Sequence, residues 1–353
     1  MLLQLRTGAA EGFEGGPGKT LGTHSLHQTK RLRKPAALRR GDVIGVVAPA
    51  SPVERELLER GMREIEGIGY RVAVNEWVLA RRSFFAGRHA QRAEALLAYL
   101  EDPSVRAIFC ARGGYGSNYV VEQLTARPIL NRLKRLPPKI VMGYSDVTTL
   151  LIFFHQTLGW TTFQGPMVTR ELAGGEVFYN RAVMEQVLGL GTAGIAIGSA
   201  AWSLRPGVAE GRLFGGCLPM LTATLGTPQE IDTRGTLLLL EDIDEKPFRI
   251  DRMLFHLRRA GKFRDVRGVI FGEMPGCGGG TTAEEGLREI ILEALGDFNV
   301  PIVFGLPFGH SRQGCLTLPI GVRARLSAEE KVTLSLLEPA VSVPPKPRRR
   351  NHA

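Results

Sequence analysis

Short apolar runs alternate with segments of helical spacing through the first half of the chain. Runs of four to eight apolar residues are typical of strands buried on both faces, whereas apolar positions three and four residues apart indicate helices. Such alternation predicts a parallel sheet covered by helices on both faces, a doubly wound α/β domain of the Rossmann or flavodoxin-like kind, over residues 41–175. The predicted strands lie at 42–49, 71–75, 105–110 and 139–142, and the predicted helices at 52–68, 91–100, 119–124 and 146–156.

The pattern changes after residue 175. Residues 176–207 are a predicted linker, with a helix over 176–190 and an edge strand or connection at 192–198. From residue 208 the apolar runs shorten and helical segments become fewer, which predicts a smaller, β-rich mixed α/β domain over 208–340. Its strands are predicted within 211–228, 237–240, 266–271 and 316–337, and its helices at 248–260 and 283–295.

The length and composition fit a two-domain enzyme. The chain has 353 residues, of which 44% are apolar, enough for two ordinary cores. No apolar run approaches the roughly 18 residues needed to span a bilayer, and the N-terminus lacks a continuous apolar segment for secretion. The four cysteines form no C-x-x-C pair, which gives no zinc or redox motif and favours a reducing cytoplasm: Cys110, Cys217, Cys277 and Cys315.

The net charge of +10 is confined to the two ends of the chain. Residues 1–40 carry eight basic against two acidic residues, and residues 344–353 add four basic residues, so residues 41–343 sum to zero. A basic binding face on the folded body is therefore not expected, and no specific nucleic-acid partner is predicted. Segments 1–40 and 341–353 are predicted to be flexible basic extensions.

A serine lies at a predicted turn between a strand and a helix. The segment reads Gly143-Tyr-Ser-Asp146 and follows the strand at 139–142. Gly143 permits a tight bend, and the helix start leaves N–H groups unpaired, so the turn would lift the Ser145 hydroxyl off the edge of the sheet. Ser145 is the first candidate for a nucleophile; the alternative is that Ser145 or Asp146 only caps the helix.

Two later segments supply an acid and a base at similar places. Glu241 directly follows a run of four leucines, and His310 follows an apolar strand and a Gly/Pro turn. Both lie just beyond predicted strands, the edge where open α/β sheets bind ligands. The order of serine, acid and histidine occurs in α/β-hydrolases, but the second glycine of their G-x-S-x-G elbow is absent. We therefore expect serine–acid–histidine chemistry but not the α/β-hydrolase fold.

A glycine loop follows the strand at 105–110. It reads Ala111-Arg-Gly-Gly-Tyr-Gly116, and its backbone N–H groups could face an anion or a developing oxyanion. Ser117, at its end, is a rival nucleophile. It ranks second because a loop with three glycines suits a backbone cradle better than a fixed attacking group.

Six motifs in order resemble the LD-carboxypeptidase family of serine peptidases over about residues 41–335. They are DVIGVVAPASP from residue 42, ARGGYG, GYSD, GRLFGGCL, LEDIDEKPFRIDR from residue 240, and PFGH with TLPIG. The resemblance implies a cytoplasmic, homodimeric enzyme that removes the terminal D-alanine from a muropeptide tetrapeptide. It also implies a triad of Ser145, Glu241 and His310, with no metal or cofactor.

That chemistry assigns further roles. The backbone N–H groups of Asp146 and Gly114 are the hypothesis for the oxyanion hole. Arg112 is a candidate for binding a substrate carboxylate, with an internal ion pair as the alternative, and Tyr144 is a candidate pocket residue. Gln164 stands where the family often carries histidine, which affects pocket details and not the triad.

Two other functions stay open. A relative that hydrolyses peptidyl-nucleotide antibiotics, as in microcin self-immunity, would use the same triad and an aromatic platform for a base, for which Trp202 and Phe214 are candidates. A binding module would instead hold an anionic ligand with the loop at 113–116 and would not react with a serine-directed covalent inhibitor.

Overall fold

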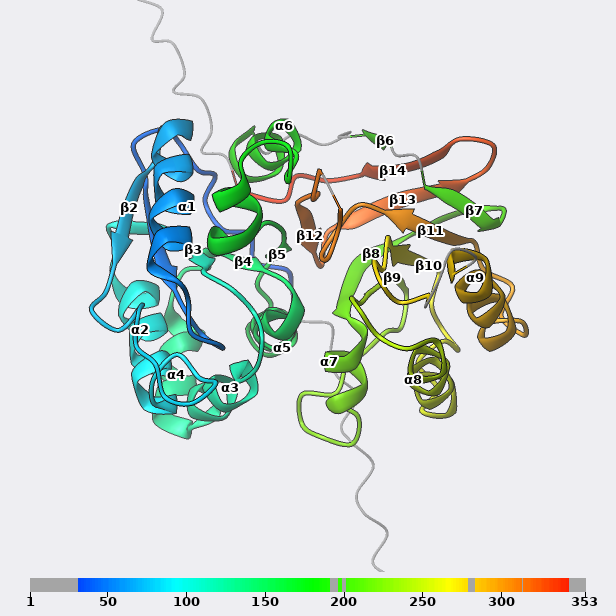
Figure 1. Cartoon of the computed structure of the whole chain (residues 1–353), viewed down its shortest axis with the longest axis horizontal. Coiled ribbons are helices and arrows are strands. Elements are labelled where there is room, and N and C mark those ends of the chain that lie inside the picture. The colour runs from blue at the N-terminus through cyan, green and yellow to red at the C-terminus, as the bar shows by residue number, and fades with distance from the viewer. Residues whose placement is uncertain (1–30, 191–195, 199–200, 279–282, 313, 343–353) are drawn as a thin grey trace, which may run out of the picture. The chain divides into compact units, whose positions relative to one another are not determined.

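The computed structural model describes residues 31–190, 196–198, 201–278, 283–312 and 314–342, which form two sheets flanked by helices (Figure 1). The first sheet has six strands in the order β12-β5-β4-β3-β1-β2. Its first five strands in chain order are parallel, and β12 runs antiparallel to β5. They are β1 (Val43–Val47), β2 (Arg71–Val74), β3 (Val105–Cys110), β4 (Ile140–Gly143), β5 (Thr162–Gln164) and β12 (Leu318–Ile320).

Helices cover both faces of this sheet because successive strand residues point to opposite sides. Phe109 of β3 packs in the same core cluster as Ile65 of α1, whereas its neighbour Ile108 packs with Leu96 of α2. The predicted doubly wound arrangement is thereby confirmed. The helices are α1 (Arg55–Ile68), α2 (His89–Glu101), α3 (Ser117–Thr125), α4 (Arg127–Arg135) and α5 (Thr148–Ile152).

The second sheet has eight strands in the order β6-β14-β13-β8-β9-β10-β11-β7. Its centre, β8 to β11, is parallel, and antiparallel strands complete both sides, so the predicted mixed α/β class is confirmed. The strands are β6 (Ala196–Gly198), β7 (Trp202–Arg205), β8 (Val208–Cys217), β9 (Thr236–Glu241), β10 (Gly268–Gly272), β11 (Ile302–Leu306), β13 (Arg323–Ala328) and β14 (Val332–Leu336).

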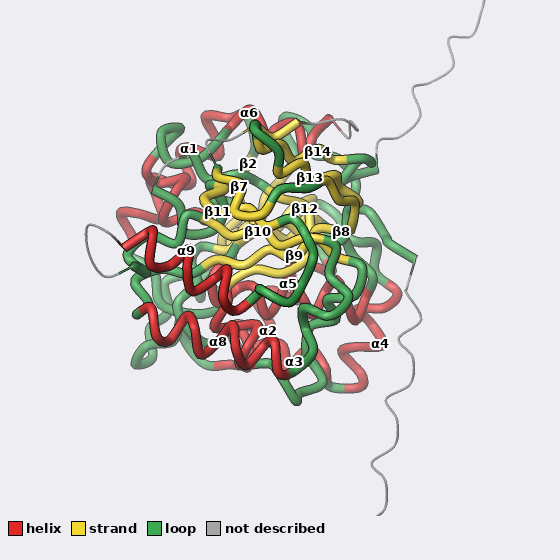
Figure 2. The backbone as a smooth tube through the Cα atoms, turned by 90° about the vertical axis from the view of Figure 1, so that its right-hand side faces the viewer, coloured by secondary structure: helices red, strands yellow, loops and turns green. Residues whose placement is uncertain are grey.

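Among the described residues, three α-helices follow β8 in the chain: α7 (Leu218–Ala223), α8 (Pro247–Arg259) and α9 (Ala283–Ala294). Figure 2 shows α8 and α9 beside the strands of the second sheet. The segment before that sheet contains α6 (Arg181–Glu185) and a following π-helical turn (Gln186–Leu190) in place of the single predicted helix over 176–190. Within the described parts of the chain, no helix has the length and apolar character required to cross a membrane.

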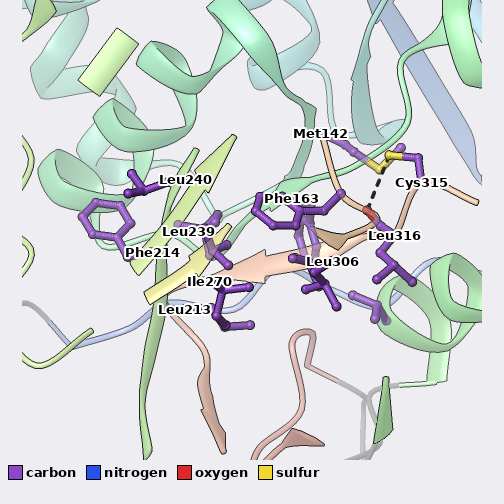
Figure 3. Close-up of a cluster of buried hydrophobic side chains, with 14 of the residues drawn as sticks. Met142, Phe163, Leu213, Phe214, Leu239, Leu240, Ile270, Leu306, Cys315 and Leu316 are labelled. Carbon is purple, nitrogen blue, oxygen red and sulfur yellow. Dashed lines mark hydrogen bonds between the residues drawn. The ribbon is translucent and has the colours of Figure 1, made fainter. Parts of the chain in front are cut away.

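One hydrophobic core joins the two sheets. Met142 of β4 and Phe163 of β5 belong to the same cluster as Leu239, Ile270 and Leu306 of the second sheet (Figure 3). The strand β12 belongs by sequence to the predicted second domain, yet it completes the first sheet, since its buried residues pair in register with β5. The shared core and the pairing of β12 with β5 hold the carboxyl ends of β4 and β9 in place relative to each other.

Part of the segment predicted as a flexible N-terminal extension is ordered in the structure. Residues 31–40 pack on the body: Arg33 N–H donates to Gly159 O at 2.7 Å, and Ser342 N–H donates to Pro35 O at 2.8 Å. Ala37 and Leu38 are buried in the core. The apolar positions between the basic residues supply the burial that the charge count did not reveal. Residues 1–30 and 343–353 lie outside the described residues.

Candidate active site

Ser145 occupies a strained turn between β4 and a short helix. Its φ is +61°, and it opens a 3₁₀ turn (Ser145–Val147) that leads into α5. Positive φ is uncommon outside glycine and costs roughly 1–3 kcal/mol, so the surrounding structure must enforce it. Gly143 is required here, because a Cβ on it would lie 2.9 Å from Val147 Cγ1. A strained, partly exposed serine at the end of a strand is the geometry of a nucleophile elbow.

Asp146 ties this turn to the glycine loop. Its buried carboxylate Oδ2 accepts a hydrogen bond from Ser117 N–H at 2.7 Å, at the start of α3. Burial raises the pKa of Asp146, although hydrogen bonds from Ser117 and Gly116 and the charge of Arg92 act in the opposite direction. Ser117 is itself fully buried. The rival nucleophile is thus an anchor for the loop and has no access to substrate.

The glycine loop lies directly against the serine. A Cβ on Gly113 would be 2.9 Å from Ser145 Cβ and 3.0 Å from its Oγ, and one on Gly114, whose φ is +104°, would be 2.2 Å from Ser51 Oγ. Ser51 N–H donates to Gly113 O at 3.2 Å. Because a trans peptide places its N–H opposite its C=O, the N–H of Gly114 points away from Ser51. In the described part of the chain, neither this N–H nor that of Asp146 has a protein acceptor.

Glu241 and His310 form a buried pair at the edge of the second sheet. Glu241 ends β9, and His310 follows β11. The imidazole Nδ1 lies 2.7 Å from Glu241 Oε2, and the same oxygen accepts the backbone N–H of His310 at 3.0 Å. Both side chains are buried. This double contact fixes the imidazole plane, and it brings together two residues that sequence spacing alone placed only at similar edges.

Two glycines make room for the Glu241 side chain. A Cβ on Gly309, whose φ is +65°, would lie 2.5 Å from Glu241 Cδ, and one on Gly272 would lie 2.9 Å from Glu241 Cβ. Any other residue at Gly309 would combine backbone strain with a clash against the carboxylate. The buried pair therefore depends on the absence of side chains at these positions.

The charge of Glu241 controls the protonation of His310. Burial is the largest influence and lowers the pKa of His310, but the charge of Glu241 and its hydrogen bond together outweigh burial and raise the pKa above its ordinary value. The neighbouring carboxyl of Asp242 has its pKa raised to about 7, chiefly by burial, with a further contribution from the charge of Glu241.

Tyr144 joins the two parts of the site. Its ring packs edge-to-face against the His310 ring, with centroids 4.9 Å apart and planes at 89°. Its hydroxyl donates to Glu171 Oε1 at 2.6 Å, and Glu171 Oε2 accepts the Met167 N–H at 3.0 Å. Tyr144 is fully buried, so its side chain has no exposed surface for the predicted contact with substrate. Since Tyr144 precedes Ser145, this packing sets the imidazole beside the nucleophile turn.

The remaining predicted residues have distinct placements. No hydrogen bond within 3.5 Å joins Ser145 to His310 among the described residues. Arg112 is half-buried, and its Nη1 donates to Pro52 O at 3.2 Å, which leaves other guanidinium N–H groups for a ligand. Gln164 is fully buried in β5, and neither atom of its side-chain amide has a protein partner in the described chain.

The two residues considered as an aromatic platform do not form one. Phe214 is buried in β8 with its ring against His155, at 4.8 Å between centroids. Trp202 lies on the edge strand β7, with the Arg288 guanidinium 3.5 Å from its ring centroid and the Phe304 ring stacked beside it. Both aromatic side chains are therefore engaged in structural contacts.

Sequence reasoning missed two residues of the site. Gly309 and Glu171 gave no separate signal, because the spacing of glycines and acids does not show which backbone approaches which side chain. Gly309 adjoins His310 in the sequence and could have been suspected on that ground. In the described residues, no group of three histidine, cysteine or acidic side chains is arranged to hold a metal ion.

Comparisons with known proteins identify the family of the chain. Residues 44–165 match the LD-carboxypeptidase N-terminal domain, and residues 210–326 match the LD-carboxypeptidase C-terminal domain. A probable murein peptide carboxypeptidase of Bacillus subtilis is 36% identical over 320 residues, which cover 88% of this chain and 95% of the relative.

Solved structures show the same fold. The muramoyltetrapeptide carboxypeptidase of Oxalobacter formigenes superposes with a TM-score of 0.73 at 26% identity, covering 86% of this chain and 99% of that one. The microcin C7 self immunity protein MccF superposes with a TM-score of 0.78 at 22% identity, covering 88% of this chain and 99% of that one, a likeness of fold alone. On these matches over most of its length, the chain belongs to the LD-carboxypeptidase family.

Proposed function

We propose that this protein is a serine-type LD-carboxypeptidase that releases the terminal D-alanine from murein tetrapeptides through Ser145, Glu241 and His310. The observation that carries the proposal is a strained, partly exposed serine with a buried carboxylate–imidazole pair packed against the same turn. The substrate class is supported by the relatives from Bacillus subtilis and Oxalobacter formigenes, which are named for murein peptides and muramoyltetrapeptides.

In the first half of the reaction, Ser145 Oγ attacks the carbonyl carbon that precedes D-alanine. His310 Nε2 accepts the hydroxyl proton, while Glu241 accepts the hydrogen bond from Nδ1–H and so keeps Nε2 as the free base. The Ser145–His310 hydrogen bond forms when substrate binds, since catalytic contacts are often too long for a hydrogen bond in unliganded enzymes.

The developing oxyanion is held by the N–H groups of Gly114 and Asp146. Both groups lie beside Ser145 and have no protein acceptor in the described chain. Donors fixed in advance cost no reorganisation when negative charge appears on the carbonyl oxygen. Arg112, at the start of the same loop, is the proposed partner for a substrate carboxylate.

The tetrahedral intermediate collapses with transfer of the proton from His310 to the leaving amine, so D-alanine departs and an ester to Ser145 remains. Water then attacks the ester carbonyl, giving its proton to His310 Nε2, and the proton passes to Ser145 Oγ as the tripeptide product is released. We place the reaction in the cytoplasm, where the four free, buried cysteines would stay reduced, and propose the homodimer as the working assembly.

The test is release of D-alanine from a murein tetrapeptide by the purified wild type, Ser145→Ala and Ser117→Ala. The proposal expects loss of release in the Ser145 variant and retention in the Ser117 variant, with L-alanine-terminated peptide as a control for stereospecificity. If the wild type releases no D-alanine, the murein assignment fails. An aminoacyl sulfamoyl nucleoside, the ligand class bound to MccF in a solved structure, is then the next substrate to test.

A further inference from the structure

An aromatic cluster lies at the outer end of the glycine loop, apart from the catalytic groups. The Phe84 and Phe85 ring centroids are 4.3 Å apart, and Tyr115 lies 5.9 Å from Phe84 and 5.7 Å from Phe85. The rings of His89 and Tyr119 stack on each other in the same cluster, with centroids 4.2 Å apart. Phe84 is 56% exposed and Tyr115 is 43% exposed. Large exposed aromatic side chains that gather at one place on a surface commonly mark a binding site.

The cluster is fixed to the glycine loop. A Cβ on Gly116 would lie 2.8 Å from Phe85 Cδ1, so the ring packs directly on the loop backbone. The buried Arg92 places its guanidinium 5.0 Å from the Phe85 ring centroid and donates to Gly116 O at 2.8 Å. Tyr115 belongs to the loop, and its N–H donates to Ser51 Oγ at 3.1 Å. The rings are therefore held in place before any ligand arrives.

A strained turn presents Phe84 to solvent. Ser83 has a φ of +55°, and the turn is closed by two hydrogen bonds, from Arg82 N–H to Phe85 O at 2.9 Å and from Phe85 N–H to Arg82 O at 3.0 Å. This tight hairpin puts Ser83 and Phe84 at its tip. The strained backbone at Ser83 holds an apolar ring in solvent, which does not stabilise the fold. This arrangement points to a binding role for the ring.

The spacing between the cluster and the nucleophile suits a muropeptide. Gly113 touches Ser145, and Tyr115 is two residues further along the loop, a span of at most roughly 7 Å. In a muropeptide tetrapeptide, the sugar is carried on the amino end, so three peptide residues, about 10 Å when extended, separate it from the bond that is cleaved. A substrate extended along the loop from Ser145 would bring its sugar to Tyr115 and Phe84.

We infer that Phe84 and Tyr115 form a subsite for the sugar ring of the substrate, a role that rests on the proposed function. The apolar face of the sugar packs on the exposed rings, and their edges leave the sugar hydroxyls in water. Arg82, exposed in the same turn and without an acidic partner in the described chain, provides positive charge toward the carboxylates of the peptide stem. The subsite thus selects sugar-bearing peptides over free ones.

The experiment compares D-alanine release from a disaccharide tetrapeptide and from the free tetrapeptide of the same sequence. Wild type, Phe84→Ala and Tyr115→Ala are assayed beside Phe255→Ala, a matched control that removes a phenylalanine of similar exposure from α8. For the sugar-bearing substrate, Phe84→Ala is expected to raise KM about tenfold with kcat unchanged, the size of one aromatic contact. For the free tetrapeptide, KM and kcat of Phe84→Ala should stay at wild-type values.

The outcomes separate the two levels of the proposal. D-alanine release from neither substrate by the wild type would overturn the proposed function and the subsite with it. Release from both substrates, with the Phe84→Ala effect absent or equal on the two, would overturn the sugar subsite and leave the proposed function intact. A Phe84→Ala effect found only with an aminoacyl sulfamoyl nucleoside would reassign the rings to base stacking.

Discussion

The two halves of the proposed active site are built by different means. The nucleophile half, comprising Ser145 and the glycine loop at 111–116, owes its geometry to backbone: a positive φ at Ser145 and a Gly113 backbone pressed against its side chain. The base half, Glu241 and His310, owes its geometry to a buried charge held by two hydrogen bonds to one oxygen. The first half should therefore be sensitive to added volume and the second to lost charge.

Two contacts that involve residues outside the proposed triad join the two halves. Tyr144 packs on His310 from the nucleophile side, and Cys217 N–H, at the end of β8, donates to Thr148 Oγ1 at 3.1 Å. Both contacts join the elements that follow β4 to the second sheet. A site divided in this way works only when both halves are present. Removing a group from either half is therefore expected to have the largest effect on activity.

Removing one group from each half tests whether they act as a unit. Ser145→Ala and His310→Gln should each lower kcat/KM by about 10⁴-fold or more, and the double variant should be no slower than the slower single one, because residues of one catalytic unit are not additive. D-alanine release measures the rates, and circular dichroism checks that both variants fold. Additive losses would contradict the coupling of the two halves.

Neutralising the acid tests the role of charge in the base half. Glu241→Gln keeps the size of the side chain and should lower kcat/KM by about 10³-fold, because the imidazolium formed during attack loses its counter-charge. The measurement is the pH dependence of kcat/KM.

The sign of the pH effect follows from the raised pKa of His310. The free enzyme needs neutral His310, so the rate climbs as pH rises through that pKa. In Glu241→Gln, both effects that raise the pKa through Glu241 are lost. Burial and the charge of Arg170 then lower the pKa of His310 against the charge of Asp242 alone, so the acidic limb of the profile should move to lower pH. A limb that stays in place would remove His310 as the titrating base.

Adding one methyl group tests the nucleophile half. Gly113→Ala places a Cβ 3.0 Å from Ser145 Oγ and should lower kcat by about 10²-fold, because it displaces the attacking oxygen from the oxyanion donors. The matched control is Gly67→Ala in α1, where a Cβ meets open space. Equal activity of the two variants would show that the close approach has no catalytic consequence.

The smallest expected effect concerns Asp242, which adjoins the acid of the base half. Its pKa of about 7 in the folded protein lies above its ordinary value of 3.8, so the folded state binds a proton that the unfolded state has released, and stability falls as pH rises from about 4 to 7. Asp242→Asn should remove this loss, on the order of 2–4 kcal/mol at pH 8.

Thermal or urea unfolding at pH 4.5 and pH 8 measures this effect, with Asp251→Asn on the exposed side of α8 as the control. The Asp242 variant should gain stability over wild type mainly at pH 8. A gain of the same size at both pH values would point to packing and exclude the buried charge as its source.

Local sequence was sufficient for the first four strands of the first sheet and for the serine turn. Alternating apolar runs gave the strands β1, β3 and β4, and Gly143-Tyr-Ser-Asp146 marked the turn, because both features depend on neighbours in the chain. The pairing of β12 with β5 joins residues far apart in the sequence, and no pattern of apolar positions specifies such a partner. The packing of residues 31–40 also depends on partners far along the chain, and their many basic residues concealed the few apolar ones that are buried.

Part of the aromatic cluster also carries a signal in the local sequence. Phe84 and Phe85 stand in a polar stretch, Ala80-Arg-Arg-Ser-Phe-Phe-Ala-Gly87, where no periodic pattern buries them. Consecutive aromatic residues in such a stretch are a signal for a binding surface. Their contact with the Gly116 backbone, however, depends on how the loops after β2 and β3 meet in space.

The most direct test of the central claim is the site of covalent labelling by a serine-directed fluorophosphonate, mapped by peptide mass spectrometry. A single adduct on Ser145, formed far more slowly in His310→Gln, is the result that a catalytic unit spanning both sheets predicts. An adduct on another serine, or none on Ser145 in an enzyme that still releases D-alanine, would contradict the claim that Ser145 and the Glu241–His310 pair form one active site.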